Sequence, residues 1–403
     1  MQMLRPKTFS RAGNCMRRGK KMQTVLGLDR IDEFESALRG KRIGLITNYS
    51  GVDSVWRTNV DIFTERELQI VKLFTPEHGL YGTGAGRGVE DTVYPEHGIP
   101  VTSLFGDKVR PGDGDLTGID VLVYDIQDVG LRYYTYIYTM TYCMEAAARL
   151  HIPFLLLDRP NPLGGRIVSG GTLELKFASF IGDYGLPLRY GLTPGELGYY
   201  FIRYRNLDMD YRVIELKNYN RDCYFPDTKA VWNIPSPALP DYDTTVCYAG
   251  GCLAGATTLS DGRGTAKPFQ IYGAPYIHMG EFYRELKREI QDEGILLRQR
   301  AFIPSERKYA GEVCYGVEFA PLRKDLDFIP ASLILLRTAA RLYPEQFALI
   351  DNETGRKHLH YLTGSEQAAG YLEGRICLEE LLEEWRVQAK EFEAVTEDIR
   401  IYR

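Results

Sequence analysis

Short apolar runs alternate with amphipathic segments through the first half of the chain. Five of the runs have the length of a β-strand, at residues 42–48, 69–75, 100–105, 121–125 and 153–158. A helix is predicted at 31–38, and another at 138–150, where apolar residues recur at helical spacing around three alanines. Nearly continuous apolar strands that alternate with helices are typical of a parallel sheet with helices on both faces. This half therefore predicts a Rossmann-like, doubly wound α/β domain.

A clear helix start lies near the end of this domain. Thr193 is a good N-cap, Pro194 suits the first helical position, and Glu196 can close a capping box, so a helix is predicted from there to about Tyr204. We therefore place the first domain at residues 22–220.

The second half has a different pattern. Residues 224–243 are rich in proline and aromatic residues, which predicts an ordered linker or cleft wall. The glycine-rich stretch 249–275 predicts a long functional loop. Helices are expected at 281–293, 332–343 and 378–392, and a strand at 315–319. We expect a smaller α/β domain at 221–403.

Composition limits the class of protein. The chain has 403 residues, a formal net charge of −5 and scattered lysines and arginines, so two or three domains are possible and a nucleic-acid partner is not expected. No apolar run approaches the roughly 20 residues of a membrane span. The basic cluster at 11–21 lacks the apolar core of a secretory signal, and Met22 is a plausible start. Residues 1–21 are therefore expected to be a disordered extension.

The chain shows no signature of a bound cofactor. Seven cysteines form no C-x-x-C pair and are odd in number, which favours reduced, structural thiols in a cytoplasmic protein. No cluster has metal-ligand spacing. Phosphate-loop, dinucleotide-binding and serine-hydrolase motifs are not found in their required settings. We therefore expect no cofactor and no metal.

Polar side chains follow three of the predicted strands. The carboxyl ends of parallel strands meet at one edge of a sheet, which is where open α/β sheets bind ligands. We therefore expect one cleft formed by the residues at these strand ends, namely Glu77, His78, Asp125, Gln127, Asp128, Arg132, Asp158, Arg159 and Asn161. A second PEHG, with Glu96 and His97, lies in a polar loop and is expected at the surface.

Six longer blocks occur in a specific order: TPEHGLYG, YDIQDVGLRYYTY, LDRPNPLGG, LRYGLTPGELGYYF, WNIPSPALP and SDGRGTAKPFQIYGAPYI. In this order they resemble the exo-β-N-acetylmuramidase family (NamZ/YbbC-like), long catalogued as a domain of unknown function. The resemblance runs from about Met22 to the end of the chain. It implies a Rossmann-like domain, a smaller α/β domain and an active-site cleft between them. It also implies release of N-acetylmuramic acid from the non-reducing ends of peptidoglycan fragments, with a saccharide or muropeptide as partner.

The chain departs from the family pattern at four places. Asp261 stands where the family usually has glutamate in SEGRGT, and Gln270 replaces the glutamate of KPFE. Tyr190 replaces the histidine of RHG, and Ser169 lies where a VEGP-like element is usual. We expect these positions at the cleft. They leave open an alternative function, a non-catalytic muropeptide-binding or sugar-binding protein of the same fold.

Glu77 is the candidate general acid. A glycosidic oxygen is protonated by a carboxylic acid that works with a second carboxylate, for which Asp261, Asp128 and Asp125 are the candidates. Glu77 could instead cap a turn, and Asp128 could be a helix N-cap. His78 could tune Glu77, bind a sugar hydroxyl or satisfy a backbone carbonyl.

Arg132 is the candidate for recognition of the lactyl carboxylate, because its planar guanidinium binds a carboxylate through two hydrogen bonds. The alternative is a buried ion pair with Asp125 or Asp158. Tyr134 and Tyr136 are expected to face the cleft and stack on sugar. Arg263 lies in the glycine-rich loop near the ligand. Asp158, Arg159 and Asn161 could serve either substrate or the X-Pro turns around them.

Overall fold

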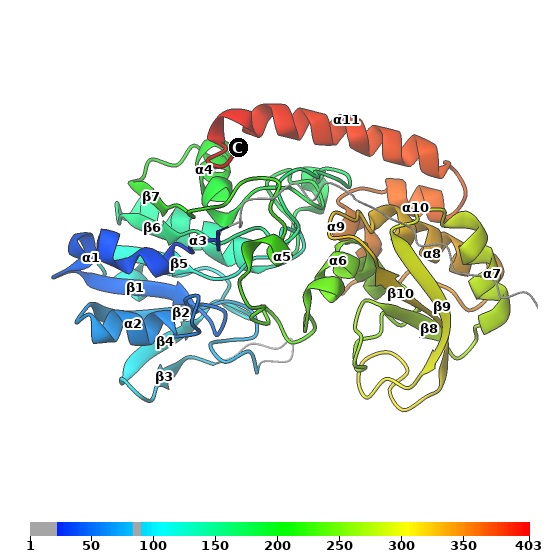
Figure 1. The fold of residues 1–403 in the computed structure, drawn as a ribbon, viewed down its shortest axis with the longest axis horizontal. Coiled ribbons are helices and arrows are strands. Elements are labelled where there is room, and N and C mark those ends of the chain that lie inside the picture. The colour runs from blue at the N-terminus through cyan, green and yellow to red at the C-terminus, as the bar shows by residue number, and fades with distance from the viewer. Residues whose placement is uncertain (1–21, 84–89) are drawn as a thin grey trace, which may run out of the picture.

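The computed structural model describes residues 22–83 and 90–403, so the predicted extension at 1–21 lies outside the described residues. Within these ranges the chain forms a seven-stranded sheet and a separate three-stranded sheet. Figure 1 shows them side by side, with the larger sheet formed by the first half of the chain. The predicted fold class, a doubly wound domain followed by a smaller α/β domain, is confirmed.

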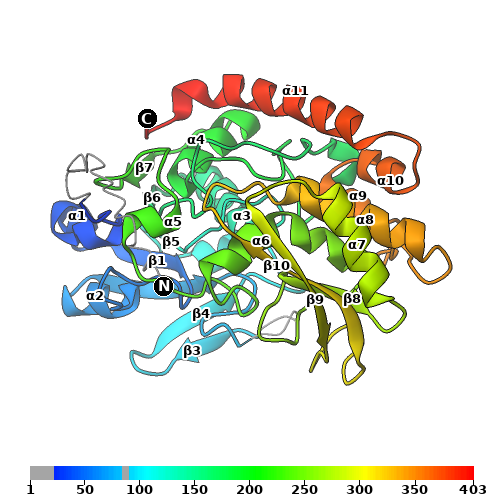
Figure 2. The ribbon, with the colours of Figure 1, turned by 45° about the vertical axis from the view of Figure 1, so that its right-hand side comes forward.

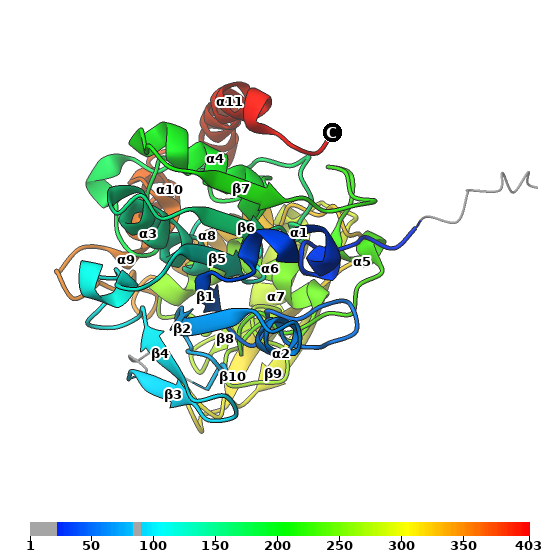
Figure 3. The same cartoon turned by 90° about the vertical axis from the view of Figure 1, so that its left-hand side faces the viewer.

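The larger sheet has the order β3-β4-β2-β1-β5-β6-β7, which Figure 3 shows from one side. Every neighbouring pair is parallel except β3 and β4, which form an antiparallel hairpin at one edge. The strand order changes direction between β1 and β5. The strands are β1 (Arg42–Thr47), β2 (Gln69–Thr75), β3 (Thr92–Tyr94), β4 (Ile99–Ser103), β5 (Val121–Asp125), β6 (Phe154–Leu157) and β7 (Tyr211–Ile214).

Alternate residues of the central strands enter two different hydrophobic cores. In β5, Val121 and Val123 pack with helices α1 (Ile31–Leu38) and α2 (Asn59–Glu65), whereas Leu122 and Tyr124 pack with α3 (Tyr136–Arg149). Helix α4 (Pro194–Arg205) lies on the same side as α3. The predicted start of α4 is confirmed, since Thr193 and Glu196 form a capping box and Pro194 is the first helical residue.

The smaller sheet is antiparallel, with the order β8-β10-β9. Its strands are β8 (Ile271–Ala274), β9 (Ile295–Phe302) and β10 (Cys314–Pro321). Helices α6 (Tyr242–Gly251) and α7 (Met279–Glu289) pack with these strands, and α8 (Ile329–Leu342) packs on both helices. One hydrophobic cluster runs continuously from α3 into this domain. Short helices α9 (His358–Thr363) and α10 (Gln367–Leu372) complete it. Helix α5 (Phe225–Thr228) lies in the linker and contacts the first domain, where Phe225 N–H donates to Pro162 O at 3.0 Å.

The last helix returns the chain to the first domain. Helix α11 (Leu378–Thr396) spans both domains in Figures 1 and 2. The tail that follows it packs on the larger sheet, where the Tyr402 hydroxyl donates to Asp158 at 2.7 Å. The first domain thus includes residues from the end of the chain, and the division at residue 220 stays a prediction.

In the second half one prediction is wrong and one strand was not predicted. The stretch 249–275 is not one loop, because it contains the end of α6, the 3-10 turn Cys252–Ala256 and β8. Its glycines allow close packing; a Cβ on Gly251 would lie 2.0 Å from the Tyr272 hydroxyl oxygen. Strand β9 was not predicted, because most of its residues are exposed along the edge of the small sheet and two of them, Arg298 and Arg300, are charged.

Candidate active site

A cavity of about 620 Å³ lies between the two domains. One wall comes from the segments that follow β2 and β5, and includes Glu77, His78 and residues 133–136. Linker residues 236–239 form a second side. The third side belongs to the small domain and includes Tyr248, Phe269, residues 263–266 and residues 305–307. The predicted cleft between the domains is therefore present.

Glu77 lies two residues beyond β2, at the carboxyl edge of the sheet, as predicted. The chain turns sharply here, with Gly79 N–H donating to Pro76 O at 3.0 Å and with positive φ angles of 71° at both His78 and Gly79. Glu77 is half-buried, and its Oε2 accepts a hydrogen bond from the Thr135 hydroxyl at 2.7 Å. The turn and this hydrogen bond hold the carboxyl group in the cavity wall.

Tyrosines form the rest of this wall. The rings of Tyr134 and Tyr136 lie 4.5 Å apart between centroids, and both residues line the cavity as predicted. The Tyr136 hydroxyl donates to Pro235 O at 2.9 Å, and so does the Tyr49 hydroxyl. These bonds fix the linker against the first domain. Burial raises the pKa of Tyr134 and Tyr136 well above that of a free phenol, so both remain neutral.

The wall from the small domain carries the charged groups. Arg263 lies on the glycine-rich loop and forms an ion pair with Asp261 at 2.9 Å. Burial lowers the pKa of Arg263, but the Asp261 carboxylate outweighs it and holds this pKa above its usual value. Asp261 itself does not line the cavity. Of the acidic residues in the described ranges, Glu77 and Glu306 do.

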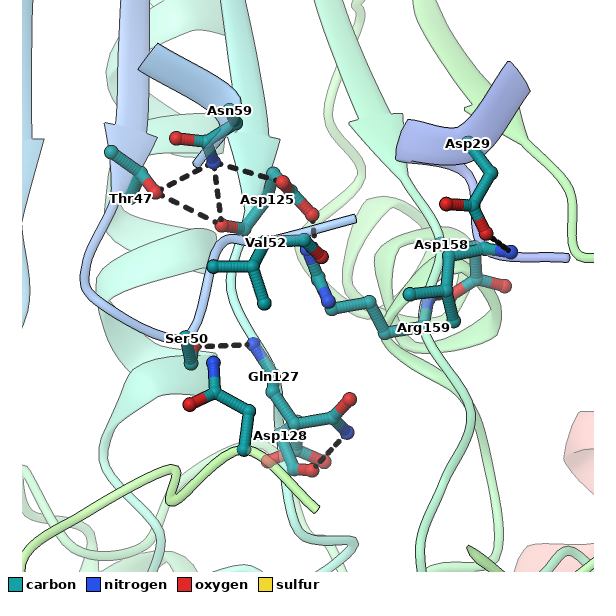
Figure 4. Close-up of polar contacts among 12 residues, drawn as sticks. Asp29, Thr47, Ser50, Val52, Asn59, Asp125, Gln127, Asp128, Asp158 and Arg159 are labelled. Carbon is teal, nitrogen blue, oxygen red and sulfur yellow. Dashed lines mark hydrogen bonds and ion pairs between the residues drawn. The ribbon is translucent and has the colours of Figure 1, made fainter. Parts of the chain in front are cut away.

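A cluster of three strand-end residues that were predicted to bind substrate fills the crevice between β1 and β5 instead (Figure 4). Asp125 is fully buried, with Arg159 Nε at 2.6 Å from its Oδ1 and Asn59 Nδ2 at 2.8 Å from its Oδ2. Gln127 donates to the carbonyls of Asp128 and Pro160. Gln127 and Arg159 line only a second cavity of about 30 Å³. Internal hydrogen bonds thus occupy the place where such sheets commonly bind a ligand.

The other strand-end residues also serve the interior. Asp158 accepts from Thr193 Oγ1 at 2.8 Å, from Gly195 N–H at 2.9 Å and from the Tyr402 hydroxyl. Asn161 donates to Leu192 O at 2.9 Å and accepts from Leu163 N–H at 3.0 Å. Burial raises the pKa of Asp158 to about 7. Neither residue lines the main cavity, so their predicted cleft positions are wrong.

Asp128 was a candidate for the second carboxylate and does not reach the cavity either. It is fully buried and accepts from Gly130 N–H at 2.8 Å and from the Tyr190 hydroxyl. Burial raises its pKa to about 6. The three candidates for the second carboxylate, Asp261, Asp128 and Asp125, all lie behind the cavity wall.

Arg132 does not face the cavity, so the predicted carboxylate contact is wrong. Its guanidinium is fully buried and donates to the carbonyls of Gly171 at 2.8 Å, Leu186 at 2.5 Å and Leu362 at 2.9 Å. Burial lowers its pKa to about 10. The predicted alternative, an ion pair with Asp125 or Asp158, does not form either. Arg132 joins the two domains through backbone carbonyls.

Comparison with known proteins agrees with this architecture. A family model described as "Exo-beta-N-acetylmuramidase NamZ, N-terminal" matches residues 43–243, and its C-terminal counterpart matches 246–402. A curated relative from Bacillus subtilis (strain 168), "Peptidoglycan beta-N-acetylmuramidase NamZ", is 36% identical over 387 residues, covering 95% of this chain and 92% of that protein. The chain belongs to the NamZ exo-β-N-acetylmuramidase family.

Two solved structures share the fold of this NamZ-family chain. Both are DUF1343 family proteins from Bacteroides fragilis. The first has a TM-score of 0.87 and 28% identity, covering 94% of this chain and 99% of that one. The second has a TM-score of 0.75 and 26% identity, covering 95% and 99%.

The departures from the family pattern lie behind the cavity and not in it. Asp261 still pairs with Arg263, Gln270 donates to Thr244 Oγ1 at 3.0 Å, and Tyr190 donates to Asp128. None of these three, nor Ser169, is among the cavity-lining residues. The expectation that they lie at the cleft surface is wrong, and a NamZ-family site is not blocked by them.

Several residues of the site were missed. Thr135, Glu306 and Arg307 line the cavity, and none was singled out from the sequence. Thr135 could have been found, because it lies inside the YYTY block beside the tyrosines. Glu306 and Arg307 lie on the loop after the unpredicted strand β9, in no recognisable motif.

The described chain gives no sign of a metal centre or a membrane span. No group of three or more His, Cys, Asp or Glu residues in 22–83 and 90–403 could hold a metal ion. Over the same residues, no helix is both long and apolar enough to cross a bilayer.

Proposed function

We propose that the protein is a glycoside hydrolase that releases N-acetylmuramic acid from the non-reducing ends of peptidoglycan fragments. Membership of the NamZ family supports the reaction class and the substrate. The observation that carries the proposal is the position of Glu77, a half-buried carboxyl in an interdomain cavity of about 620 Å³, a volume suited to a small saccharide.

We infer that Glu77 is the general acid. Its Oε2 is held by Thr135, which leaves the other carboxyl oxygen to face the glycosidic oxygen. The proton passes from Glu77 to that oxygen as the bond to the anomeric carbon breaks. Water screens charge poorly in a cavity lined by tyrosines. The charge that develops on the substrate as the glycosidic bond breaks therefore interacts more strongly with Glu77 than it would in water.

The second catalytic group is either Glu306, on the opposite wall, or a group of the substrate itself. Glycosidases commonly use a second carboxylate, and some of the families that work without one use substrate assistance. Glu306 is exposed and is held near Gly264, where a Cβ would lie 2.7 Å from the Glu306 nitrogen. Glu306→Gln distinguishes the two cases: loss of turnover assigns the role to Glu306, and retained turnover assigns it to the substrate.

The proposal includes a cytoplasmic location and a role in recycling of cell-wall fragments. The six described cysteines are free, which supports the predicted reducing, cytoplasmic setting. An enzyme that removes muramic acid there would act in recycling of cell-wall fragments.

The alternative, a sugar-binding protein without activity, is tested directly. Purified protein is incubated with a chromogenic β-N-acetylmuramide and, separately, with the corresponding β-N-acetylglucosaminide. Release of the chromophore from the muramide, with less from the glucosaminide, is the expected result. Binding of N-acetylmuramic acid without any release would establish the binding protein instead.

A further inference from the structure

The loop 303–313, between β9 and β10, is fixed to the small domain at several points. Ser305 donates to Gly264 O through its N–H at 2.8 Å and through its hydroxyl at 2.9 Å. The Tyr309 hydroxyl donates to Thr258 O at 2.7 Å. Gly311 N–H donates to Pro304 O at 2.8 Å and closes the loop. These contacts hold the residues between Ser305 and Tyr309 in one position.

Lys308 makes more hydrogen bonds than any other of these attachments. Its Nζ lies at 2.9 Å from Ala254 O, 3.1 Å from Gly255 O and 3.0 Å from Leu259 O, and it also donates to Thr257 O. Burial lowers its pKa to about 8. The ammonium thus joins the loop to the segment that leads into Asp261 and Arg263.

The loop backbone is strained where it presents Arg307. Arg307 has a φ of +68° and Tyr309 a φ of +59°, in the left-handed region that residues other than glycine rarely adopt. Such a conformation is unfavourable and persists only where the surroundings impose it. The surroundings here are the attachments of Ser305, Lys308 and Tyr309. Their effect is to place the exposed Arg307 in the cavity wall.

Arg307 differs from Arg263, the other arginine of the lining. Arg263 directs Nε and Nη2 at the Asp261 carboxylate. Arg307 forms no ion pair or side-chain hydrogen bond with any residue in 22–83 or 90–403. A guanidinium cannot lose its charge near neutral pH, so Arg307 gives the cavity a positive group that is available to an anionic ligand.

We propose that Arg307 binds the lactyl carboxylate of the muramic acid residue and thereby sets the preference for muramic acid over glucosamine. The assignment rests on the proposed function, because that substrate is a hexosamine with a carboxylate at its 3-position. Two hydrogen bonds from one guanidinium to a carboxylate are directional as well as strong. Glu77 lies on the other wall, so the sugar is held between the acid and the arginine.

The experiment compares Arg307→Ala with wild type on the β-N-acetylmuramide and the β-N-acetylglucosaminide. The kcat/KM for the muramide should fall about tenfold to a hundredfold, as for loss of a charged hydrogen bond, with the glucosaminide little changed. Arg307→Lys should recover part of the muramide activity, because it keeps the charge but not the planar group. Arg300→Ala is the control, since Arg300 lies on β9, outside the cavity lining, 3.8 Å from Glu318.

An equal loss on both substrates, or an unchanged ratio, would overturn the proposal. If Arg263→Ala alone shifted the ratio, the role would pass to Arg263. Calorimetry with N-acetylmuramic acid and N-acetylglucosamine separates this inference from the proposed function. Wild type that binds the muramic sugar through Arg307 but hydrolyses neither glycoside would refute the hydrolase and leave the arginine assignment standing.

Discussion

Asp125 and Glu77 occupy similar places in the sheet and have opposite surroundings. Both lie at the carboxyl edge, Asp125 at the end of β5 and Glu77 two residues past β2. Asp125 is fully buried and bonded to both Arg159 and Asn59. Glu77 is half-buried, bonded to Thr135, and lines the cavity. A position at a strand end therefore shows which edge of the sheet a residue occupies. Whether the residue can act on a ligand depends on whether other residues already occupy its hydrogen-bonding atoms.

The carboxyl edge of the sheet also has one crevice filled by side chains and one open cavity. The crevice at the change of strand order, between β1 and β5, is filled by the network of Asp125, Arg159 and Gln127 (Figure 4). The large cavity lies instead beyond β2 and β5, where the small domain covers the edge. Linker residues Phe225, Val231 and Asn233 lie beside this filled crevice.

The largest effect is expected for Glu77→Gln. The amide keeps the size and can still accept from Thr135, but it cannot give up a proton. Turnover of the muramide should fall by about a hundredfold to ten-thousandfold, as for loss of a general acid. The melting temperature should stay near that of wild type. Turnover assays and thermal unfolding on the same sample measure both quantities.

Asp125→Asn is the matched control for this prediction. Its amide would place an N–H₂ group against Arg159 or Asn59, both donors, so we expect loss of stability and largely retained turnover in the folded fraction. If Asp125→Asn abolished turnover at an unchanged melting temperature, Asp125 would have a catalytic role. If Glu77→Gln turned over at the wild-type rate, Glu77 would not be the general acid.

A smaller effect, on folding and not on selectivity, is expected for Arg132→Met. The methionine fills part of the space but leaves the carbonyls of Gly171, Leu186 and Leu362 without this donor. The free energy of unfolding should fall by about 2–4 kcal/mol, measured by denaturant titration. The ratio of muramide to glucosaminide activity should stay at the wild-type value. If activity on the muramide fell and activity on the glucosaminide did not, Arg132 would have a role in substrate binding.

A change confined to the pH dependence of stability is expected for Asp158. Burial raises the pKa of this carboxyl from 3.8 to about 7 in the folded protein. Between these values the folded state binds more protons than the unfolded state, so this group's stabilising contribution is complete below about pH 4 and declines as the pH rises to 7. Asp158→Asn should flatten the fall in melting temperature over that range. An unchanged slope would show that Asp158 titrates normally.

Much of the fold could be predicted from the sequence because the first domain follows simple rules. Strand β2 and helix α1 begin and end at the predicted residues, and the capping box of α4 was evident from Thr193 to Glu196. Apolar runs of strand length and a strong helix cap are local signals. Strand β9 was missed because its exposed edge carries the charges of a surface segment, which no local pattern distinguishes from a loop.

The site was harder to predict than the sheet. Five residues were correctly predicted to line the cavity, namely Glu77, His78, Tyr134, Tyr136 and Arg263. The sequence alone could not separate them from Asp125, Asp128, Arg132 or Asp158, because burial depends on loops that arrive from distant parts of the chain. Asp158, for example, is covered by Tyr402, 244 residues away. Arg307 depends on contacts with residues 254–264, which sequence spacing does not reveal.

Lys308 fills the place that a bound cation occupies in many loop-rich proteins. A calcium ion would gather backbone oxygens in a similar way, but it could dissociate. Here the positive charge is covalently attached to the loop that it organises. Its three N–H groups serve four carbonyl oxygens, so at least two oxygens share one donor, as oxygens share a metal. The loop that carries Arg307 is therefore held in place by a charge of the chain itself. Its structure should not depend on free metal ions, and a chelator should not change it.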